Sequence, residues 1–361
     1  MSRIIAVTSG KGGTGKTTLA VNLAVQLAEL GHRTCIFDAD LGTANINIML
    51  GINPKADIGD VVNGKMTIHD IMIHDPSGID IIPGSSGVES IANLGAKRLD
   101  SLVAAFADAG SYDFYLFDTG AGISRRVIAF CLAAAELLLV ITDEPTSLTD
   151  AYSLLKVLNH HKYEGRIKVV VNRCADLESA RKVYRRFRAA VDLYLGVELE
   201  PLGLVFQDEA VSLSMQRQSP FIKLFPDSKA AGCVRSLAQR LTGDRAKETA
   251  PADIAAFWSN CVSYFNMPLE LPGQDADPEE DNTRTADARQ EEMLREVKRL
   301  ADNFAGLTDE LTSALKSLEK AGRRVESEES VQHEDEAGQQ AGERPIYFLD
   351  LEAFVAETEK K

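Results

Sequence analysis

A glycine-rich segment near the amino terminus has the residue types and spacing of a phosphate-binding loop. Residues 10–17 read Gly-Lys-Gly-Gly-Thr-Gly-Lys-Thr and satisfy the pattern G-x-x-x-x-G-K-[ST]. Glycines let backbone N–H groups approach phosphate oxygens at the start of a helix, where the helix dipole favours anions. We expect Lys16 to neutralise the β and γ phosphates and the Thr17 hydroxyl to bind Mg²⁺. A turn without a ligand would explain neither the lysine nor the hydroxyl.

The surroundings of this loop agree with that interpretation. An apolar strand is predicted from Ile4 to Val7 and a helix from Thr18 to Leu30, so the loop joins a strand to a helix. The expected ligand is a nucleoside triphosphate with Mg²⁺. The residues expected to contact the nucleotide here are Gly10, Lys11, Gly12, Gly13, Thr14, Gly15, Lys16, Thr17 and Thr18.

Two further apolar runs end in carboxylates. The first is followed by Asp38 and Asp40, and the second by Asp118, Gly120 and Gly122. Acids at strand ends are ordinary turn residues when taken alone, but beside a phosphate-binding loop they fit nucleotide hydrolysis. Asp118 fits the Walker B position, which binds Mg²⁺ directly or through water, and the two glycines allow a mobile loop to approach the terminal phosphate.

The second lysine of the loop carries a family resemblance. Lys11, in Lys-Gly-Gly-Thr-Gly-Lys-Thr-Thr, resembles the deviant Walker A motif of the MinD/ParA class of ATPases. The resemblance implies an ATP-sandwiched homodimer in which Lys11 reaches the phosphates of the facing subunit and acts with Lys16 in catalysis. A cation placed there stabilises charge on the transferring group, as an arginine finger does.

The same resemblance assigns roles to other positions. It implies that Asp40 orients the attacking water in switch I and that Asp38 lies on the metal side, so the expected metal set is Thr17, Asp38 and Asp118. It places Asn172 and Arg173 on the adenine side. Asp208 is expected near the base as well, although Val-Phe-Gln-Asp lacks the proline common there.

Finer matches resemble the FlhG/FleN (YlxH-like) subfamily, which regulates flagellar number and placement. They lie in residues 38–45, 118–124 and 144–152, with a weaker match in 215–220. The resemblance spans about residues 3 to 243. It implies flagellar basal-body or regulatory proteins, or the flagellar GTPase FlhF, as partners. Only Met1 and Ser2 precede the stretch that carries the resemblance, whereas many FlhG proteins have a segment there that stimulates FlhF.

The pattern of apolar runs predicts the fold. Strands that are apolar throughout, with helix-length segments between them, indicate a P-loop α/β domain: a mostly parallel, twisted sheet of about 7–8 strands with helices on both faces. Ligands of such sheets bind at the carboxyl ends of the strands. The domain is expected to span residues 1–245. Predicted strands cover residues 4–9, 33–37, 79–82, 112–117, 137–142, 167–171 and 199–205.

The last third of the chain has a different character, a helical and partly disordered extension. Residues 247–361 hold 27 Asp and Glu against 13 Lys and Arg, which leaves 27 against 26 in the rest. We predict an amphipathic helix at 252–267, an acidic linker at 273–288, a heptad-patterned helix or helical hairpin at 289–322, and an acidic tail at 323–361 with a short apolar segment at 345–355. The heptad segment fits a partner-binding arm as well as a helix folded onto the main domain.

Two interpretations of the amphipathic helix remain open. Its apolar residues recur at helical spacing from Ile254 to Phe265, just beyond the ATPase domain, where family members carry a membrane-targeting helix. No Lys or Arg lies between Asp253 and Asn266, which favours packing against the domain instead. The chain is expected to be cytoplasmic, with peripheral contact to the inner face of the cell membrane as the alternative to packing.

Four functions are compatible with these motifs. The favoured one is a Mg²⁺-dependent ATPase whose ATP-driven dimerisation regulates flagellar number or placement. A MinD-like ATPase that positions the division site or another polar cargo is the alternative. A ParA-type DNA segregator is disfavoured because the nearly neutral domain lacks the cationic field that non-specific DNA binding needs. The fourth is a non-catalytic scaffold.

Overall fold

The computed structural model describes residues 2–40, 45–84, 96–243 and 253–267. All of them belong to one compact unit. The predicted linker at 273–288, the heptad segment at 289–322 and the acidic tail at 323–361 lie outside the described residues.

The described part of the chain is built on an eight-stranded sheet with the order β3-β4-β2-β5-β1-β6-β7-β8. Neighbouring strands are parallel except for β3 and β4, which confirms the predicted mostly parallel α/β sheet. The sequence missed β3, because two residues are too few to form an apolar run. The strands are β1 (Arg3–Ser9), β2 (Thr34–Ala39), β3 (Ile73–His74), β4 (Asp80–Ile82), β5 (Phe114–Ala121), β6 (Glu136–Ile141), β7 (Arg166–Cys174) and β8 (Glu200–Phe206).

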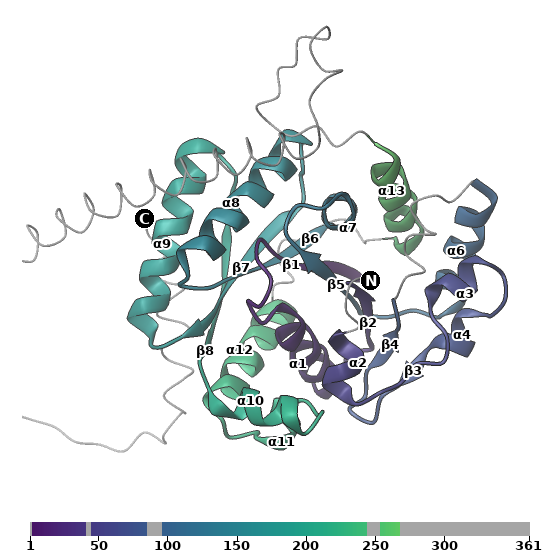
Figure 1. Ribbon diagram of the computed structural model, residues 1–361, viewed down its shortest axis with the longest axis horizontal. Coiled ribbons are helices and arrows are strands. Elements are labelled where there is room, and N and C mark those ends of the chain that lie inside the picture. The colour runs from purple at the N-terminus through teal and green to yellow at the C-terminus, as the bar shows by residue number, and fades with distance from the viewer. Residues whose placement is uncertain (1, 41–44, 85–95, 244–252, 268–361) are drawn as a thin grey trace, which may run out of the picture. The chain divides into compact units, whose positions relative to one another are not determined.

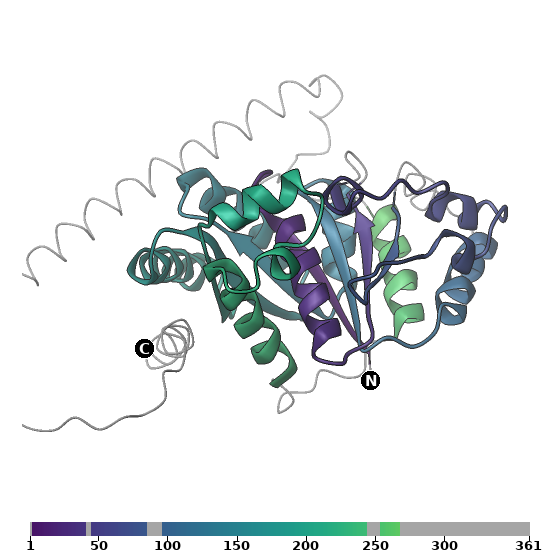
Figure 2. The same cartoon turned by 90° about the horizontal axis from the view of Figure 1, so that it is seen from below.

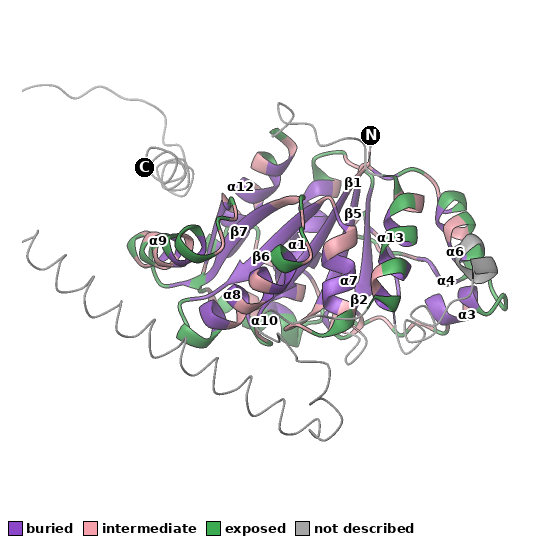
Figure 3. Ribbon diagram, turned by 90° about the horizontal axis from the view of Figure 1, so that it is seen from above, coloured by how far each residue is buried: buried purple, intermediate pink, exposed green. Residues whose placement is uncertain are grey.

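Helices cover both faces of this sheet. Helices α1 and α12 pack together on one face, and α7, α8 and α13 lie on the other (Figure 1 and, turned, Figure 2). The strands between them are almost entirely buried (Figure 3). The helices are α1 (Lys16–Glu29), α2 (Asn45–Leu50), α3 (Ile58–Val62), α4 (Ile68–Ile71), α6 (Ala96–Asp108), α7 (Arg125–Ala133), α8 (Pro145–His160), α9 (Leu177–Tyr194), α10 (Glu209–Gln216), α11 (Phe221–Leu224), α12 (Lys229–Gly243) and α13 (Ile254–Asn266).

Short polar side chains start several of these helices. Ser124, Asp176, Asp208 and Asp253 each accept a hydrogen bond from a backbone N–H in the first turn of α7, α9, α10 and α13, respectively. Such caps satisfy N–H groups that have no partner within the helix. They fix where each helix begins after its strand or loop.

Helix α13 is packed into the domain. Its apolar face, Phe257, Trp258, Cys261, Val262 and Phe265, is buried against α6 and α7. The Trp258 ring lies 4.8 Å from that of Phe106 in α6, and the Phe257 ring lies 4.3 Å from that of Phe117 in β5. Of the two interpretations left open by the sequence, packing is therefore the arrangement seen. In the part of the chain that is described, no helix combines the length and apolar character needed to span a bilayer.

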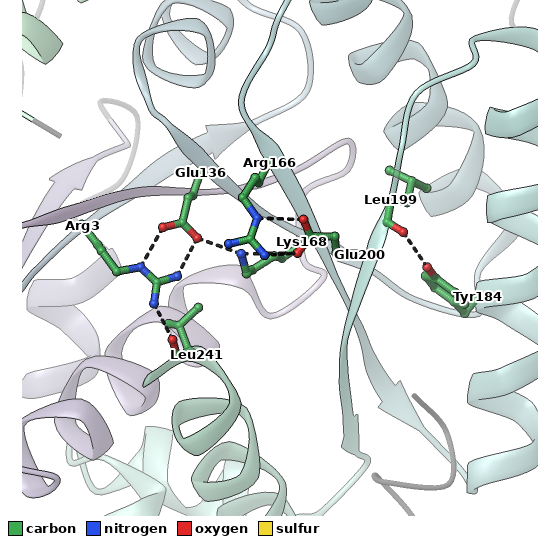
Figure 4. A network of polar contacts seen from close by, with 8 residues as sticks. All are labelled: Arg3, Glu136, Arg166, Lys168, Tyr184, Leu199, Glu200 and Leu241. Atoms are coloured by element: carbon green, nitrogen blue, oxygen red, sulfur yellow. Dashed lines mark hydrogen bonds and ion pairs between the residues drawn. The ribbon is translucent and has the colours of Figure 1, made fainter. Parts of the chain in front are cut away.

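A charged network joins the amino ends of four strands (Figure 4). Glu136 of β6 accepts from Arg3 of β1 at 2.7 and 2.6 Å and from the Lys168 ammonium of β7 at 2.9 Å. Arg166 of β7 pairs with Glu200 of β8 through two bonds of 2.8 and 2.6 Å. Burial would raise the pKa of Glu136, but the hydrogen bonds and charges of Arg3 and Lys168 hold it below its usual value. The network therefore links β1, β6, β7 and β8 at the end of the sheet opposite the glycine-rich loop.

Trp258→Ala should lower the free energy of unfolding by about 3 kcal/mol, because a fully buried large ring leaves a cavity. Urea unfolding followed by circular dichroism measures the change. Ser259→Ala, on the exposed face of the same helix, is the matched control and should shift it by less than about 0.5 kcal/mol. A Trp258→Ala loss as small as the control's would show that α13 adds little to the core.

Glu136→Gln should cost about 3 kcal/mol at neutral pH, because it leaves the buried Lys168 without its closest counter-charge. The folded-state pKa of Glu136 is lowered, so its stabilisation is complete above the ordinary value of 4.5 and is lost as pH falls through the folded value. Urea titrations at several pH values should show the wild type and variant converging in acid. Glu200→Gln, at a more exposed site, should cost no more than about 1 kcal/mol.

Candidate functional site

The predicted phosphate-binding loop joins β1 to α1, as the sequence indicated. Gly13 and Gly15 have φ angles of 79° and 85°, a conformation that glycine adopts without strain. At Gly15 a Cβ atom would also lie 2.5 Å from the Asn172 amide nitrogen. The backbone at these two positions therefore favours glycine, which fits a loop that lets phosphate oxygens approach its N–H groups.

Lys16 occupies the centre of the site and is paired within the chain. Its ammonium donates to Asp118 Oδ1 at 2.8 Å, and the two side chains are only 7% and 0% exposed. The Thr17 side chain also hydrogen-bonds Asp118. The structure thus brings the loop lysine, the loop hydroxyl and the predicted Walker B acid into direct contact.

Asp38 and Asp118 form a carboxylate pair across adjacent strands. They are direct partners in the β2–β5 register, and Oδ2 of each is buried without a hydrogen-bond partner. Burial, and then the charge of Asp118, raises the pKa of Asp38 to about 7. Burial also raises the pKa of Asp118, against the opposing effects of Lys16 and Thr17. Two orphaned acid oxygens beside a threonine hydroxyl fit Mg²⁺, which prefers oxygen ligands and takes few from the protein.

Asp40 lies beside this pair. Its backbone N–H donates to Asp38 Oδ1 at 3.1 Å, and its carboxylate accepts from Asn45 of α2 at 3.2 Å. A Cβ atom on Gly120 would lie 3.5 Å from Asp40 Oδ1, so the two predicted positions are neighbours. Gly122 has a φ of 87° and donates to the Ser9 carbonyl at 3.0 Å, which ties the loop after β5 to the start of the phosphate-binding loop.

The three residues predicted on the adenine side lie in different surroundings. Asn172, at the end of β7, donates to the Thr14 carbonyl at 2.7 Å and so supports the phosphate-binding loop itself. Arg173 follows it with a φ of 59° and an exposed side chain. Asp208 caps α10 at Ala210 and accepts from the α12 residue Ala230, at 2.9 and 3.1 Å. The contacts seen for Asp208 thus connect helices, and its place near the base stays a prediction.

Lys11 has partners that the sequence reasoning missed. Its ammonium donates to Glu144 Oε2 at 2.6 Å and to the Thr146 hydroxyl at 2.8 Å, at the start of α8. Residues 144–146 follow β6, so the rule that ligand sites form after parallel strands could have drawn attention to them. The separation of more than 130 residues hid the contact with Lys11.

The site as a whole gathers cations, orphaned carboxylate oxygens and a glycine cradle at the carboxyl ends of β1, β2, β5 and β7. The cradle and Lys16 suit a polyphosphate, whereas the acids suit the metal ion that accompanies it. Remaining members of the expected set complete the loop: Gly10 and Thr14 are buried, Thr17 and Thr18 are half-buried, and Gly12 is exposed.

Comparisons with known proteins agree with this geometry. The family model of the CobQ/CobB/MinD/ParA nucleotide-binding domain matches residues 5–221. The antiactivator FleN of Pseudomonas aeruginosa is 40% identical over 240 residues, which cover 66% of this chain and 86% of that protein. The flagellum site-determining protein YlxH of Helicobacter pylori is 29% identical over 269 residues, covering 73% and 91%.

A solved structure of a related protein has a similar fold. The septum site-determining protein MinD of Pyrococcus horikoshii, complexed with Mg-ADP, aligns with a TM-score of 0.55 and 30% identity over 69% of this chain and all of that one. The family match covers more than half of the sequence and contains the phosphate-binding loop and both strand-end acids. The chain therefore belongs to the CobQ/CobB/MinD/ParA family of nucleotide-binding proteins.

Proposed function

We propose that this protein is a Mg²⁺-dependent ATPase whose ATP-bound form is a homodimer and whose ATP cycle regulates flagellar number or placement. One observation carries the ATPase part: the buried Lys16–Asp118 pair beside two orphaned carboxylate oxygens. The Lys16 ammonium carries the charge that suits phosphate, and the Asp118 carboxylate carries the charge that suits Mg²⁺. The flagellar part is supported by the similarity to FleN and YlxH.

The residues would exchange partners when nucleotide binds. Lys16 would leave Asp118 for the β and γ phosphates, and Asp118 and Asp38 would turn their oxygens to the metal side with Thr17. Bound Mg²⁺ neutralises phosphate charge in the transition state. Asp40, held by Asn45, would orient the attacking water.

A nucleotide can drive dimerisation only if the dimer contacts it better than the monomer does. Lys11 would supply that difference by meeting the γ-phosphate region of the facing chain, where it also stabilises the transition state. Hydrolysis would remove the contact and return the monomer. Lys11 and Lys16 therefore have separate tasks: Lys16 binds nucleotide within its own chain, and Lys11 joins two chains.

The partners proposed are flagellar. They are the GTPase FlhF or proteins of the flagellar basal body and its regulation. Nucleic acid is a poor candidate, because the first 246 residues carry 27 acids and 26 bases. Peripheral contact with the inner face of the cell membrane through α13 would require that helix to leave its site, since its apolar face is buried.

Lys11→Ala should abolish the ATP-dependent dimer and leave nucleotide binding by the monomer, whereas Lys16→Ala should abolish both. Asp40→Ala should retain the dimer and lower phosphate release at least about 100-fold. Size exclusion with light scattering, run with Mg²⁺-ATP, gives the dimer, and fluorescent ATP titration gives binding. Lys223→Ala is the control, because Lys223 pairs with Glu29 at an exposure of 39%, close to the 38% of Lys11. A wild-type protein that stays monomeric with Mg²⁺-ATP would refute the dimer.

Cells that lack this protein should have an altered number or position of flagella, and the wild-type gene should restore the normal pattern while Lys16→Ala should not. Electron microscopy of negatively stained cells counts the flagella, and phase microscopy locates division septa. Normal flagella with misplaced septa would instead favour the MinD-like role in division.

A further inference from the structure

Within its own chain, Lys11 is engaged at the start of α8. Its ammonium lies 2.6 Å from Glu144 Oε2 and 2.8 Å from Thr146 Oγ1. Glu144 is the N-cap residue of α8, yet its side chain makes no capping bond to that helix. Its carboxylate is therefore available to Lys11. The Thr146 hydroxyl, two residues further along the chain, is a second acceptor.

The backbone around Lys11 holds it in that place. The Ser9 hydroxyl donates to the Lys11 carbonyl at 2.9 Å. Gly10 lies so close to α8 that a Cβ atom there would be 2.1 Å from the backbone of Asp150 and Ala151. The start of the loop is thus seated on α8, and the Lys11 contact follows from the packing of two elements.

This contact competes with the task proposed for Lys11. An ammonium that reaches the triphosphate of a facing chain must give up acceptors in its own chain. Resting on the proposed function, we propose that Glu144 and Thr146 hold Lys11 within its own chain before ATP binds, and that release of this contact is a step in forming the dimer. The contact therefore sets how readily ATP drives two chains together.

The solvent exposure of Lys11 and Glu144 limits how strongly their contact can hold Lys11 in its own chain. We call this hold the restraint on Lys11. Lys11 is 38% exposed and Glu144 51%. Pairs this exposed change an equilibrium by no more than about fivefold. The contact biases dimerisation and does not block it. Arg173 also acts electrostatically on Glu144, so a cation remains near the carboxylate once Lys11 leaves.

The contact itself can be tested on the monomer without nucleotide. Acetylation with a water-soluble reagent, quantified by mass spectrometry, reports how accessible and how basic each lysine is. Glu144→Gln should raise the labelling rate of Lys11 two- to fivefold and leave Lys223 unchanged. Glu29→Gln is the matched control: it should raise labelling of Lys223, its partner at 2.7 Å, and leave Lys11 unchanged. Unchanged Lys11 labelling in Glu144→Gln would overturn the proposal.

The effect of the restraint on dimerisation is tested by measuring how much ATP and how much protein are needed to form half of the dimer. Glu144→Gln should lower the ATP concentration and the protein concentration at the dimer midpoint up to about fivefold, and Thr146→Val should shift them in the same direction by less. Glu29→Gln should match the wild type. A weaker or unchanged dimer in Glu144→Gln, with faster Lys11 labelling, would overturn the restraint and show that Glu144 supports Lys11 in the dimer or is neutral.

The two assays separate this proposal from the proposed function. If the wild type forms no dimer with Mg²⁺-ATP, the proposed function fails and the restraint fails with it, whatever the labelling shows. If the wild type forms the dimer and Glu144→Gln does not strengthen it, the proposed function stands and only the restraint fails.

Discussion

A single buried ion pair determines how the nucleotide end of this molecule works. Lys16 and Asp118 neutralise one another almost completely out of contact with water, the first at the start of α1 and the second within β5. A buried pair gains little net stability, because desolvation costs about as much as the attraction returns. Removing either partner alone leaves a buried charge. The only inexpensive way to separate them is to supply new partners for both at once, and a triphosphate with its metal ion has the right charges to do so. Selectivity for Mg²⁺-bound nucleotide can therefore arise from the cost of leaving a charge behind.

The two ends of the sheet use charge in opposite ways. At the amino ends, Glu136 has bonds from both Arg3 and Lys168, and Arg166 and Glu200 are paired through two bonds. At the carboxyl ends, Asp38 and Asp118 each keep a buried oxygen without a partner. Satisfied polar groups make a structure rigid, whereas unsatisfied ones raise its energy until a ligand arrives. The satisfied network therefore lies on β1, β6, β7 and β8, whereas the acids with orphaned oxygens lie on β2 and β5 at the opposite end of the same sheet.

The sequence predicted what depends on local pattern. Continuous apolar runs gave seven of the strands, and the glycine and lysine spacing gave the phosphate-binding loop, because each signal lies within a few residues. The two-residue β3 was missed for the same reason. The fate of α13 could not be settled, since an apolar helical face suits a core and a membrane surface equally well. Contacts between distant residues were also out of reach: Lys11 with Glu144, and Asn172 with Thr14, arise only when β1, β6 and β7 lie side by side. The sequence also did not reveal the helix-capping contacts of Asp208, and its place near the base stays a prediction.

Helix α13 supports the site from the far side of the sheet. Successive side chains of a strand point to opposite faces, so Phe37 and Phe117 face away from the acids that follow them, Asp38 and Asp118. Both phenylalanine rings lie against Trp258, at 5.5 and 5.8 Å. The aromatic cluster therefore packs beneath the two strand ends whose next residues carry the carboxylate pair. Close packing transmits small displacements, because a dense core has few voids to absorb them. Trp258 of α13 thus contacts the residues next to Asp38 and Asp118 in sequence, on the opposite face of the sheet. A helix that the sequence placed outside the ATPase domain thus packs against the two strands that carry Asp38 and Asp118.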